Sequence, residues 1–548
     1  MKKKFILIAT FVGLLMSGCS DSFLDEVAKD KTYADNLYTD LNGFNASKHA
    51  LLNMVREERG EAILSIEFGM MWKVGTDVAW ANSEFSWSRG LNRYTEADLN
   101  STMQFLNGES TDPSAHPGVF LVMYRCINAA NMLIDRAENK GVDWGGATPA
   151  DNEKRKNEVV AHARLIRAWC YRHLAMTFGA VPISEHEITG SSYRDDWERE
   201  PVEKVQALME QDLLFAEKYL PEKADNVTTL SKVVAQHFLT ELYLWENRNE
   251  DAVAKGKAAV SNPNYKLITA RYGVKKNQPG CAFMDQFLDG NILTSEGNTE
   301  ALWILPNTTL DNTNGRYPNS MRRTWVSEYN KLGIDYKPEY GGRGLGRAAI
   351  TAWVFSIYEP QDDRFSEYAV RKSYIDKKGN TVVCDMAASK MKSNNNKWAS
   401  TRKWDWTFPE KNRWNDGYAY CNQTFLRLAD TYLLYAEALH KTGDDAEAAK
   451  YINKVRTRSH ATPITAADVT LDYILDERAR ELVTEEYRRE TLIRTGKLVE
   501  RTRKYNPIAA GTRDHVPGIQ DYQVLLPIPQ VIIDANVGKP MEQNPGYK

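Results

Sequence analysis

Apolar side chains recur at intervals close to 3.6 residues in several separate stretches of the chain, and this spacing predicts amphipathic helices. The stretches are 119–138, 158–178, 201–220, 233–260 and 428–459. Gly179 directly follows the second stretch, where a glycine suits the C-terminal end of a helix. Prolines stand at both ends of the third stretch. The chain is therefore predicted to be mainly helical.

The stretch 428–459 has the helix-turn-helix pattern of a tetratricopeptide-like repeat. Gly443 and Asp444 form its turn, and the small residues Ala436 and Ala448 allow its two helices to approach closely. The apolar stripes of the two helices consist of Tyr432, Tyr435, Ala436, Leu439, Ala448, Ile452 and Val455. A second unit of this kind spans 233–260. Two such units predict a scaffold of stacked helix pairs.

The region 262–420 has no sustained helical period and is rich in Gly, Asn, Pro and aromatic residues. Half of the 14 tryptophans lie in it: Trp303, Trp325, Trp353, Trp398, Trp404, Trp406 and Trp414. Irregular chain of this length within a compact protein usually carries function. We predict a helical repeat scaffold, formed by 30–261 and 421–505, that carries a large loop-rich insertion with short β-strands such as Ala301–Leu305. Residues 506–548 form a C-terminal segment.

The N-terminus has the form of an export signal. Lys2, Lys3 and Lys4 precede an apolar run that ends in Ser17-Gly-Cys19. The run is shorter than the roughly 20 residues that span a bilayer as a helix, so a removable signal is predicted for residues 1–18. Cys19 then becomes the first residue, and acyl chains on it anchor the protein. An ordinary signal peptide with an incidental cysteine is the alternative.

Charge and cysteine content exclude some classes of function. The 70 basic and 73 acidic side chains nearly balance, which argues against nucleic-acid binding. The cysteines beyond Cys19 are odd in number and have no zinc-binding spacing. Cys126 and Cys170 are expected to be small buried side chains, with a mutual disulfide as the alternative. Cys281, within Pro279-Gly-Cys-Ala282, is expected to be an exposed loop thiol.

The dense charges of 476–497 are the one place where catalysis can be suspected. Glu481 and Glu485 are one helical turn apart in the predicted helix, so a carboxylate pair for glycoside hydrolysis is conceivable. Arginines, however, alternate with the glutamates throughout the stretch. Ion pairing is expected to neutralise the carboxylates and keep their pKa low, which does not suit an acid catalyst. No nucleophile elbow, phosphate loop or zinc-protease helix is visible in the sequence.

An ordered set of segments resembles the SusD/RagB family of surface lipoproteins. The segments are Cys19-Ser-Asp-Ser-Phe-Leu-Asp25, Ala161-His-Ala-Arg-Leu-Ile-Arg-Ala168, Phe178-Gly-Ala-Val-Pro182, Phe425-Leu-Arg-Leu-Ala-Asp430, Arg494-Thr-Gly-Lys497, Leu526-Pro-Ile-Pro529 and Gln543-Asn-Pro-Gly-Tyr547. Thr491 departs from the family pattern, which commonly has an acidic residue there. Glu486 stands where glycine is common, and Val531 where a polar residue is common.

The resemblance implies one SusD-like domain over 19–548 that binds nutrients without turnover. It implies capture of oligosaccharides for a SusC-like TonB-dependent transporter, over which the protein closes like a lid. The helical face is expected to meet the transporter and the loop-rich face the ligand. The acidic run after Cys19 resembles a surface-export signal, so the lipid-anchored protein is expected on the outside of the outer membrane. No nucleic acid is expected as a partner.

Sugar binding requires flat aromatic faces with polar side chains around them, and the predicted loops offer two candidate segments. The first, 76–89, contains Trp80 and Trp87 with Asn82 between them. Family binding sites lie partly in this early region. Docking of these rings onto the helices is the alternative. Trp169, Trp245 and Trp303 are assigned to packing, because they fall in helical or strand patterns.

The second segment, 312–347, contains Trp325 and Tyr329 and ends at Arg347. Arg347 and Tyr374 are expected to supply polar contacts. Asp40 and Asn42, near the start of the first helix, are candidate ligand contacts, with helix capping as the favoured alternative.

Two other functions stay open at this point. The chain could be a structural or peptide-binding partner of the transporter that binds no sugar, since helical repeats often dock proteins. It could also be an envelope glycoside hydrolase. No cofactor is expected. The many Asp and Asn residues leave a structural calcium ion open, although no loop has the EF-hand pattern.

Overall fold

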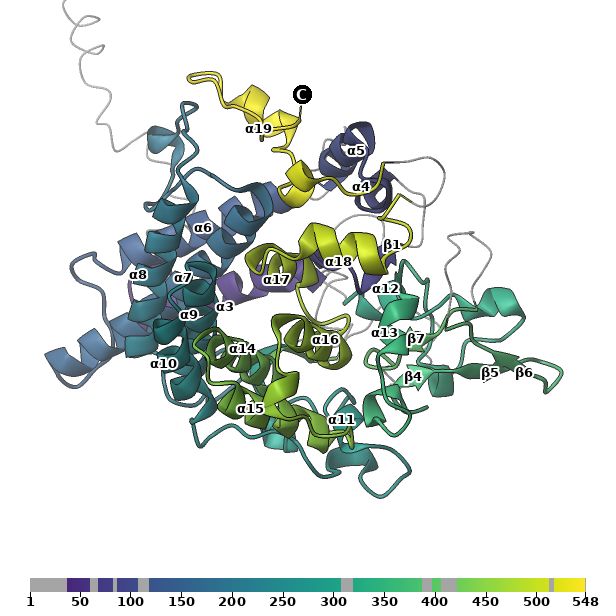
Figure 1. The fold of residues 1–548 in the computed structure, drawn as a ribbon. Helices are drawn as coiled ribbons and strands as arrows, with labels where there is room; N and C mark the ends of the chain where they lie inside the picture. Colours follow the sequence, from purple (N-terminus) through teal and green to yellow (C-terminus); the bar gives the residue numbers. More distant parts are fainter. Residues whose placement is uncertain are drawn as a thin grey trace, which may run out of the picture.

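The computed structural model describes residues 37–59, 68–81, 86–106, 118–306, 319–386, 397–405, 421–511 and 517–547. Helices make up most of this part of the chain, and its strands are short and paired two by two. In Figure 1 the long helices within 119–260 (α6 to α10) lie on the left and the helices within 428–505 (α14 to α18) in the centre. The labelled strands within 79–81 and 370–401 (β1 and β4 to β7) lie on the right with the short helices within 321–356 (α12 and α13). The predicted class, a helical scaffold with a loop-rich insertion, is confirmed.

The first part of the scaffold is a series of helices in which successive members pack on one another. They are α3 (Leu41–Val55), α6 (Val119–Arg136), α7 (Pro149–Phe178), α8 (Val202–Tyr219), α9 (Lys232–Trp245) and α10 (Asn249–Val260). Helix α7 begins earlier than the predicted 158, because Thr148 and Asp151 form a capping box ahead of Pro149. Its first turns carry no apolar stripe, so periodicity could not find them. Gly179 ends the helix with a φ of 74°, as predicted.

Both predicted helix pairs are present. Helices α14 (Leu428–Lys441) and α15 (Asp445–Arg458) form the pair predicted at 428–459, and α9 and α10 form the earlier one. The pairs stack, because α10 packs directly on α14. The contact is close at Gly256, where a Cβ atom would lie 2.6 Å from Cδ2 of Tyr435. A glycine therefore allows the two repeats to approach each other.

Helices α16 (Leu471–Leu482), α17 (Arg488–Arg494) and α18 (Leu498–Tyr505) complete the scaffold. The prediction of Glu481 and Glu485 on one helix is wrong. Helix α16 ends at Leu482, and Thr484 then adopts a left-handed φ of 71°. Glu485 is therefore displaced from the helical turn above Glu481. The C-terminal segment contains one further short helix, α19 (Gln530–Ala535).

The insertion consists of short helices and two-stranded sheets. Its helices are α11 (Ala282–Asp285), α12 (Met321–Trp325) and α13 (Ala352–Ser356). Its strands are β2 (Ala301–Leu305), β3 (Ala348–Ile350), β4 (Val370–Arg371), β5 (Ser373–Ile375), β6 (Thr381–Val383) and β7 (Ser400–Thr401). The antiparallel pairs are β2 with β8 (Gln423–Arg427), β4 with β7, and β5 with β6. The strand predicted at Ala301–Leu305 is confirmed.

The segment 76–89, predicted as a loop, contains regular structure. Ala79–Ala81 forms strand β1, which pairs antiparallel with β3 of the insertion. Helix α4 (Ser86–Arg93) and helix α5 (Glu96–Leu106) follow. Asn92 bridges the backbone of Ala81 through its side-chain amide, with hydrogen bonds of 3.0 and 2.6 Å. The hydrophobic pattern could not predict strand β1, because the strand is short and its partner strand β3 is distant in the sequence.

The core assignments of the tryptophans are confirmed. Trp169 on α7 and Trp303 on β2 are buried, and Trp245 is partly buried against the same core. The indole rings of Trp169 and Trp303 meet edge to face at 6.3 Å. The insertion is thus packed onto the scaffold through strand β2.

Candidate functional site

Strand pair β1–β3 is the point where the early region, the insertion and the C-terminal helices meet. The backbone N–H of Thr351 donates to the carbonyl of Val78 at 2.9 Å. On the other side, the amide of Asn506 donates to the carbonyl of Thr76 at 2.7 Å and to that of Ala79 at 3.1 Å. These bonds give hydrogen-bond donors to backbone carbonyl groups that the short two-stranded sheet does not itself pair. We refer to β1, β3 and the residues around them as the β1–β3 site.

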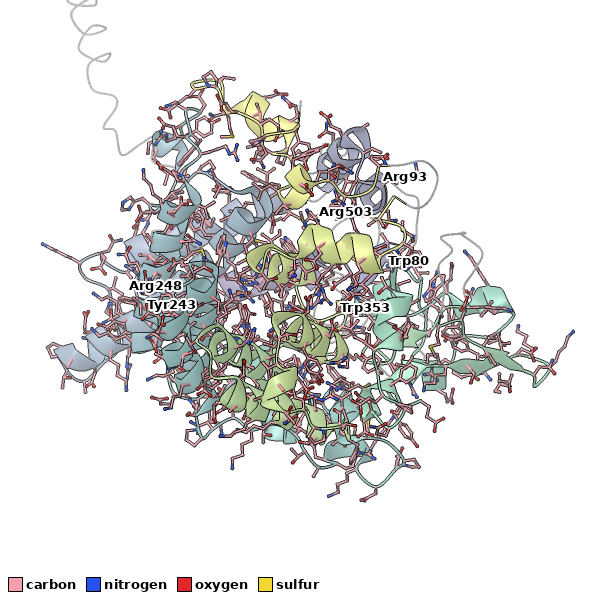
Figure 2. The ribbon with its side chains drawn as sticks, viewed as in Figure 1. Trp80, Arg93, Tyr243, Arg248, Trp353 and Arg503 are labelled. Atoms are coloured by element: carbon pink, nitrogen blue, oxygen red, sulfur yellow. The ribbon has the colours of Figure 1, made fainter. Side chains whose placement is uncertain are left out.

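Trp80 lies in the middle of β1, opposite Ala349 of β3. Its indole packs in a small apolar cluster with Ala349, Trp398 and Ile508, and the ring centroids of the two tryptophans are 6.4 Å apart. Figure 2 labels Trp80 at this position. The cluster unites four segments that are distant in sequence. Packing of Trp80 therefore holds β1 in contact with β3 and with the segments that carry Trp398 and Ile508.

Trp325 and Arg347 are brought to the same site. Trp325 ends α12, which packs on β3, and Arg347 directly precedes β3. The two segments are joined by backbone hydrogen bonds from Gly346 to Val326 (2.8 Å) and from Leu345 to Arg323 (3.0 Å). Arg347 is partly exposed. The two predicted segments, 76–89 and 312–347, therefore both contribute residues to the β1–β3 site.

Tyr329 and Tyr374 form a second aromatic group beside this site. Their rings stack at 4.8 Å with an interplanar angle of 23°. The hydroxyl of Tyr329 donates to the carbonyl of Gly342 at 2.8 Å, and that of Tyr374 is 2.8 Å from the hydroxyl of Ser327. Burial raises the pKa of both phenols, so both stay neutral.

The candidate aromatic rings are covered by protein. Trp80, Trp325, Tyr329 and Tyr374 are at most 2% exposed. No face of these four rings is open in this structure, which corresponds to the docking alternative. Their contact with a ligand stays a prediction.

The remaining candidates have separate positions. Asp40 caps helix α3 by accepting a hydrogen bond from the Gly43 N–H at 2.8 Å, as the capping alternative predicted. Asn42 is exposed on the first turn of that helix. Asn82 and the side chain of Trp87 lie outside the described residues, as does Cys19. Asp40 and Asn42 are therefore not part of the β1–β3 site.

The predicted ion pairing of 476–497 is confirmed, and the pairs are buried. Glu481 contacts Arg427 and Arg458, and Nη1 of Arg364 donates to it at 3.0 Å. Glu477 accepts from Arg364 and Arg456 at 2.7 Å each and from Arg480 at 2.8 Å. These arginines come from the insertion, strand β8 and helices α15 and α16. The glutamates of α16 therefore connect separate parts of the fold.

The arginines overcome the effect of burial on these carboxylates. Burial alone would raise the pKa of Glu477, but Arg364, Arg480 and Arg456 lower it to about 2. The pKa of Glu481 is lowered too, chiefly by Arg458 and Arg427, against the same desolvation. Glu485, bound by Arg427 and Lys403, also has a lowered pKa. None of the three is a suitable acid catalyst at neutral pH.

A second carboxylate, Asp77, ties the β1–β3 site to the scaffold. It directly precedes Val78 and is fully buried. Arg488 of α17 donates to both of its oxygens at 2.8 and 2.7 Å, and Nε of Arg501 on α18 donates at 2.8 Å. These guanidinium groups lower the pKa of Asp77 against the desolvation that burial causes. The position of β1 is thus set by α17 and α18.

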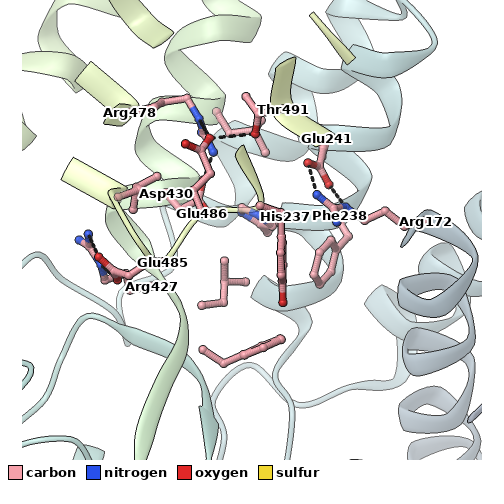
Figure 3. Close-up of a pocket in the computed structure, with 15 residues that line it drawn as sticks. Arg172, His237, Phe238, Glu241, Arg427, Asp430, Arg478, Glu485, Glu486 and Thr491 are labelled. Atoms are coloured by element: carbon pink, nitrogen blue, oxygen red, sulfur yellow. Dashed lines mark hydrogen bonds and ion pairs between the residues drawn. The ribbon is translucent and has the colours of Figure 1, made fainter. Parts of the chain in front are cut away.

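Figure 3 shows a small pocket lined by residues of α7, α9, β8, α14, α16 and the loop before α17. Its carboxylates are all paired. Glu241 binds Arg172, Glu485 binds Arg427, and Arg478 binds both Glu486 and Asp430. The hydroxyl of Thr491 donates to Glu486 at 2.8 Å. The carboxylates of this pocket are therefore part of the ion-pair network.

The prediction that Cys281 is exposed is wrong. The side chain is buried in a cluster with Phe283, Met284, Phe287 and Ala369. Cys126 and Cys170 are buried free thiols, in agreement with the packing interpretation. Within the described ranges, no group of three or more His, Cys, Asp or Glu side chains is placed to hold a metal ion. A bound calcium ion stays a prediction.

Two family models match the chain. The model described as the SusD family matches residues 259–547, and the model described as starch-binding associating with outer membrane matches residues 54–244. Of the curated relatives, "SusD-like protein P2" of Formosa agariphila is 24% identical over 77% of this chain and 79% of its own length. "Starch-binding protein SusD" of Bacteroides thetaiotaomicron is 37% identical over 22% of this chain and 21% of its own length.

Solved structures share the fold. A "laminarin binding SusD-like protein" superposes with a TM-score of 0.67 at 20% identity, covering 92% of this chain and 99% of its own. Two of these proteins are named for what they bind, which is starch in one case and laminarin in the other. None of these names is that of an enzyme. These names and the paired carboxylates agree with the prediction that the chain is not an enzyme.

Removing the charge of Glu481 should destabilise the fold strongly. Glu481→Gln leaves buried arginines with too little negative charge, and such a loss costs about 3–5 kcal/mol of unfolding free energy. Urea denaturation followed by circular dichroism measures it. The matched control is Glu447→Gln, which weakens the exposed pair with Lys450 and should cost less than about 1 kcal/mol. Equal small losses in both variants would contradict the role given to Glu481.

The same carboxylates predict acid sensitivity. A carboxylate whose pKa is lowered by folding stabilises the fold above its ordinary pKa, and this contribution disappears as the pH falls through the folded value. For Glu477 the window runs from its ordinary pKa of 4.5 down to about 2. The unfolding free energy measured by urea titration should therefore fall below about pH 4.5, by about 1.4 kcal/mol for this group with each pH unit inside the window. A flat profile between pH 4.5 and 2 would refute the pairing.

Proposed function

The chain belongs to the SusD family, and we propose that it is a lipid-anchored glycan-binding protein on the outer membrane surface that delivers oligosaccharides to a TonB-dependent transporter. The observation that carries the proposal is the family match over 259–547, which includes the whole insertion and the helix pair α14–α15. The earlier match over 54–244 includes β1 and the scaffold helices α6, α7 and α8. Together the two matches include every segment that builds the β1–β3 site.

The carboxylate of the β1–β3 site supports a function without turnover. Asp77 is paired with Arg488 and Arg501, and the rings of Trp80, Trp325, Tyr329 and Tyr374 are covered by protein. Paired carboxylates cannot protonate a glycosidic oxygen. Capture without turnover follows from this combination.

The division of the fold supports a partnership with a transporter. Stacked helix pairs present continuous helical surfaces, and the insertion lies on a different side of the molecule (Figure 1). One side can dock a protein while the other holds a ligand. No helix in the described part of the chain is long and apolar enough to cross a membrane. Membrane attachment is proposed through Cys19 and its lipid, because Cys19 directly follows the apolar run and Ser17-Gly18 of the predicted export signal.

A glycan panel tests the proposed binding. A soluble form beginning at Ser20 should bind at least one oligosaccharide with micromolar to millimolar affinity, a strength that allows capture and release. A glycan array followed by isothermal titration calorimetry measures it, with reducing-sugar release as the check for hydrolysis. Failure to bind neutral, uronic and sulfated glycans, with the circular dichroism of a folded protein, would favour a structural or peptide-binding role.

The lipid anchor has its own test. Cys19→Ala should abolish labelling by a fatty-acid analogue and release the protein from membranes, because the acylated side chain is missing. The glycan affinity of the folded body should not change. Ser17→Ala, which keeps the cysteine, is the matched control and should retain label and membrane attachment. Membrane retention of the Cys19→Ala protein would argue against a lipid anchor.

A further inference from the structure

Cys126 of α6 and Cys170 of α7 face each other in the core of the scaffold. The two helices pack directly on one another and lie together on the left of Figure 1. Both side chains are at most 1% exposed, and the Cys170 thiol interacts with the Cys126 thiol. In the structure both are free thiols. Two sulfur atoms therefore meet across a helix–helix interface.

The contacts on either side of the thiols fix their register. Two pairs of residues that join α6 to α7 bracket the cysteines. These pairs are Tyr124 with Tyr171, whose ring centroids are 6.5 Å apart, and Asn131 with Arg167, whose Nη1 donates to the amide oxygen at 2.8 Å. Position 126 lies between 124 and 131 on α6, and position 170 lies between 167 and 171 on α7. The helices run antiparallel at these contacts, so the two cysteines occupy matching positions.

The surroundings of the two thiols are apolar. Both side chains belong to the main hydrophobic cluster of the protein. They are not part of a metal site, since no group of three or more His, Cys, Asp or Glu side chains in the described ranges is placed to hold an ion. A disulfide is the covalent bond that two cysteines at matching positions can form.

Burial determines when such a bond can form. Burial raises the pKa of the Cys170 thiol well above its ordinary value, and the neighbouring Cys126 raises it further. Thiol–disulfide exchange requires a thiolate that can reach its partner. The packed helices protect the two thiols from such exchange. Any exchange therefore has to precede the packing of α6 on α7.

The predicted export signal determines where the chain folds. Residues 1–18 have the form of a signal that directs the chain into the cell envelope. Disulfides form and persist in oxidising compartments of this kind, whereas they are rare in the cytosol. The chain is therefore expected to meet an oxidising compartment before α6 and α7 have packed.

We propose that Cys126 and Cys170 are oxidised to a disulfide that links α6 to α7 while the exported protein folds. The oxidant is the disulfide of an envelope dithiol–disulfide oxidoreductase. One thiolate of the pair attacks this disulfide and forms a mixed disulfide, and the second thiolate then displaces the oxidoreductase. The S–S bond of the scaffold forms, and the oxidoreductase takes up the two electrons and two protons as a dithiol.

The link stabilises the part of the scaffold on which other elements pack. Helix α7 packs on α3, α6 and α8, and its Arg172 and His173 bind Glu490 of α17. The bond closes the loop between α6 and α7 and restricts the unfolded chain. The proposal depends on export of the chain. It is independent of glycan binding.

Peptide mapping tests the link directly. Protein isolated from the envelope of the exporting cells is unfolded in an alkylating reagent without reductant and is then digested with trypsin. Trypsin releases the peptides 126–136 and 168–172, each of which contains one cysteine. The expected product is the two peptides joined at their combined mass less two hydrogens, and a reductant should separate them. Alkylated Cys126 and Cys170 in the unreduced sample would overturn the proposal.

The other cysteines supply the internal control. Cys384 and Cys421 should carry the alkyl label in the same unreduced sample, which shows that the reagent reaches buried thiols once the protein is unfolded. Joined peptides that contain Cys384 or Cys421 in place of the predicted pair would also overturn the proposal.

Urea denaturation measures the contribution of the link to stability. The denaturation midpoint of the wild type should fall when a reductant is present, because the loop between α6 and α7 is then no longer closed in the unfolded chain. Cys126→Ala/Cys170→Ala should show no such shift, and the matched control Cys384→Ala should keep it. A midpoint of the wild type that does not respond to reductant would contradict the link. If the double variant does not fold, the peptide map of the wild type decides alone.

Discussion

Buried arginine–carboxylate pairs are the interaction on which the arrangement of this protein depends. Glu477 and Glu481 of α16 bind arginines from the insertion, from β8 and from α15, so they join regions that have no common helix or sheet. Asp77 does the same for strand β1 by binding Arg488 and Arg501. Removing ions from water is costly, and each group is tolerated only where its partners are in place. The network therefore specifies how the segments assemble, because an alternative packing would leave a charge buried and unpaired.

This constraint explains how a loop-rich insertion can present an ordered surface. Its strands are too short to be stable alone, and its helices have at most five residues. The insertion is fixed to the scaffold through Arg364 and strand β2, and β1 is fixed through Asp77. Arg501 binds Asp77, and its guanidinium group also contacts the stacked rings of Trp353 and Tyr505. The same guanidinium group thus links the buried charges to this aromatic pair.

Much of the scaffold could be predicted from the sequence, because helix pairs such as 428–459 carry a strong apolar period. The alternating charges of 476–497 predicted that the glutamates are paired, but not their partners, because Glu481 binds Arg364, Arg427 and Arg458 from outside the stretch. The break after Leu482 could not be predicted either. The burial of Cys281 was missed because its covering residues are distant in sequence. The burial of Trp80 agrees with the docking alternative, but the residues that cover it could not be predicted for the same reason. No local signal joins Trp353 to Tyr505. The departures from the family pattern at 486 and 491 contact each other, since Thr491 donates to Glu486 and Glu486 binds Arg478. The acidic group common at 491 is here supplied from 486.

The most direct test of the account is a crystal structure of the protein with an oligosaccharide bound. The account predicts a sugar at the β1–β3 site, with Asp77 still bound by Arg488 and Arg501 as in the structure without ligand. A sugar bound away from the β1–β3 site would contradict the account. So would a complex in which the Asp77 ion pairs have to break before the ligand fits.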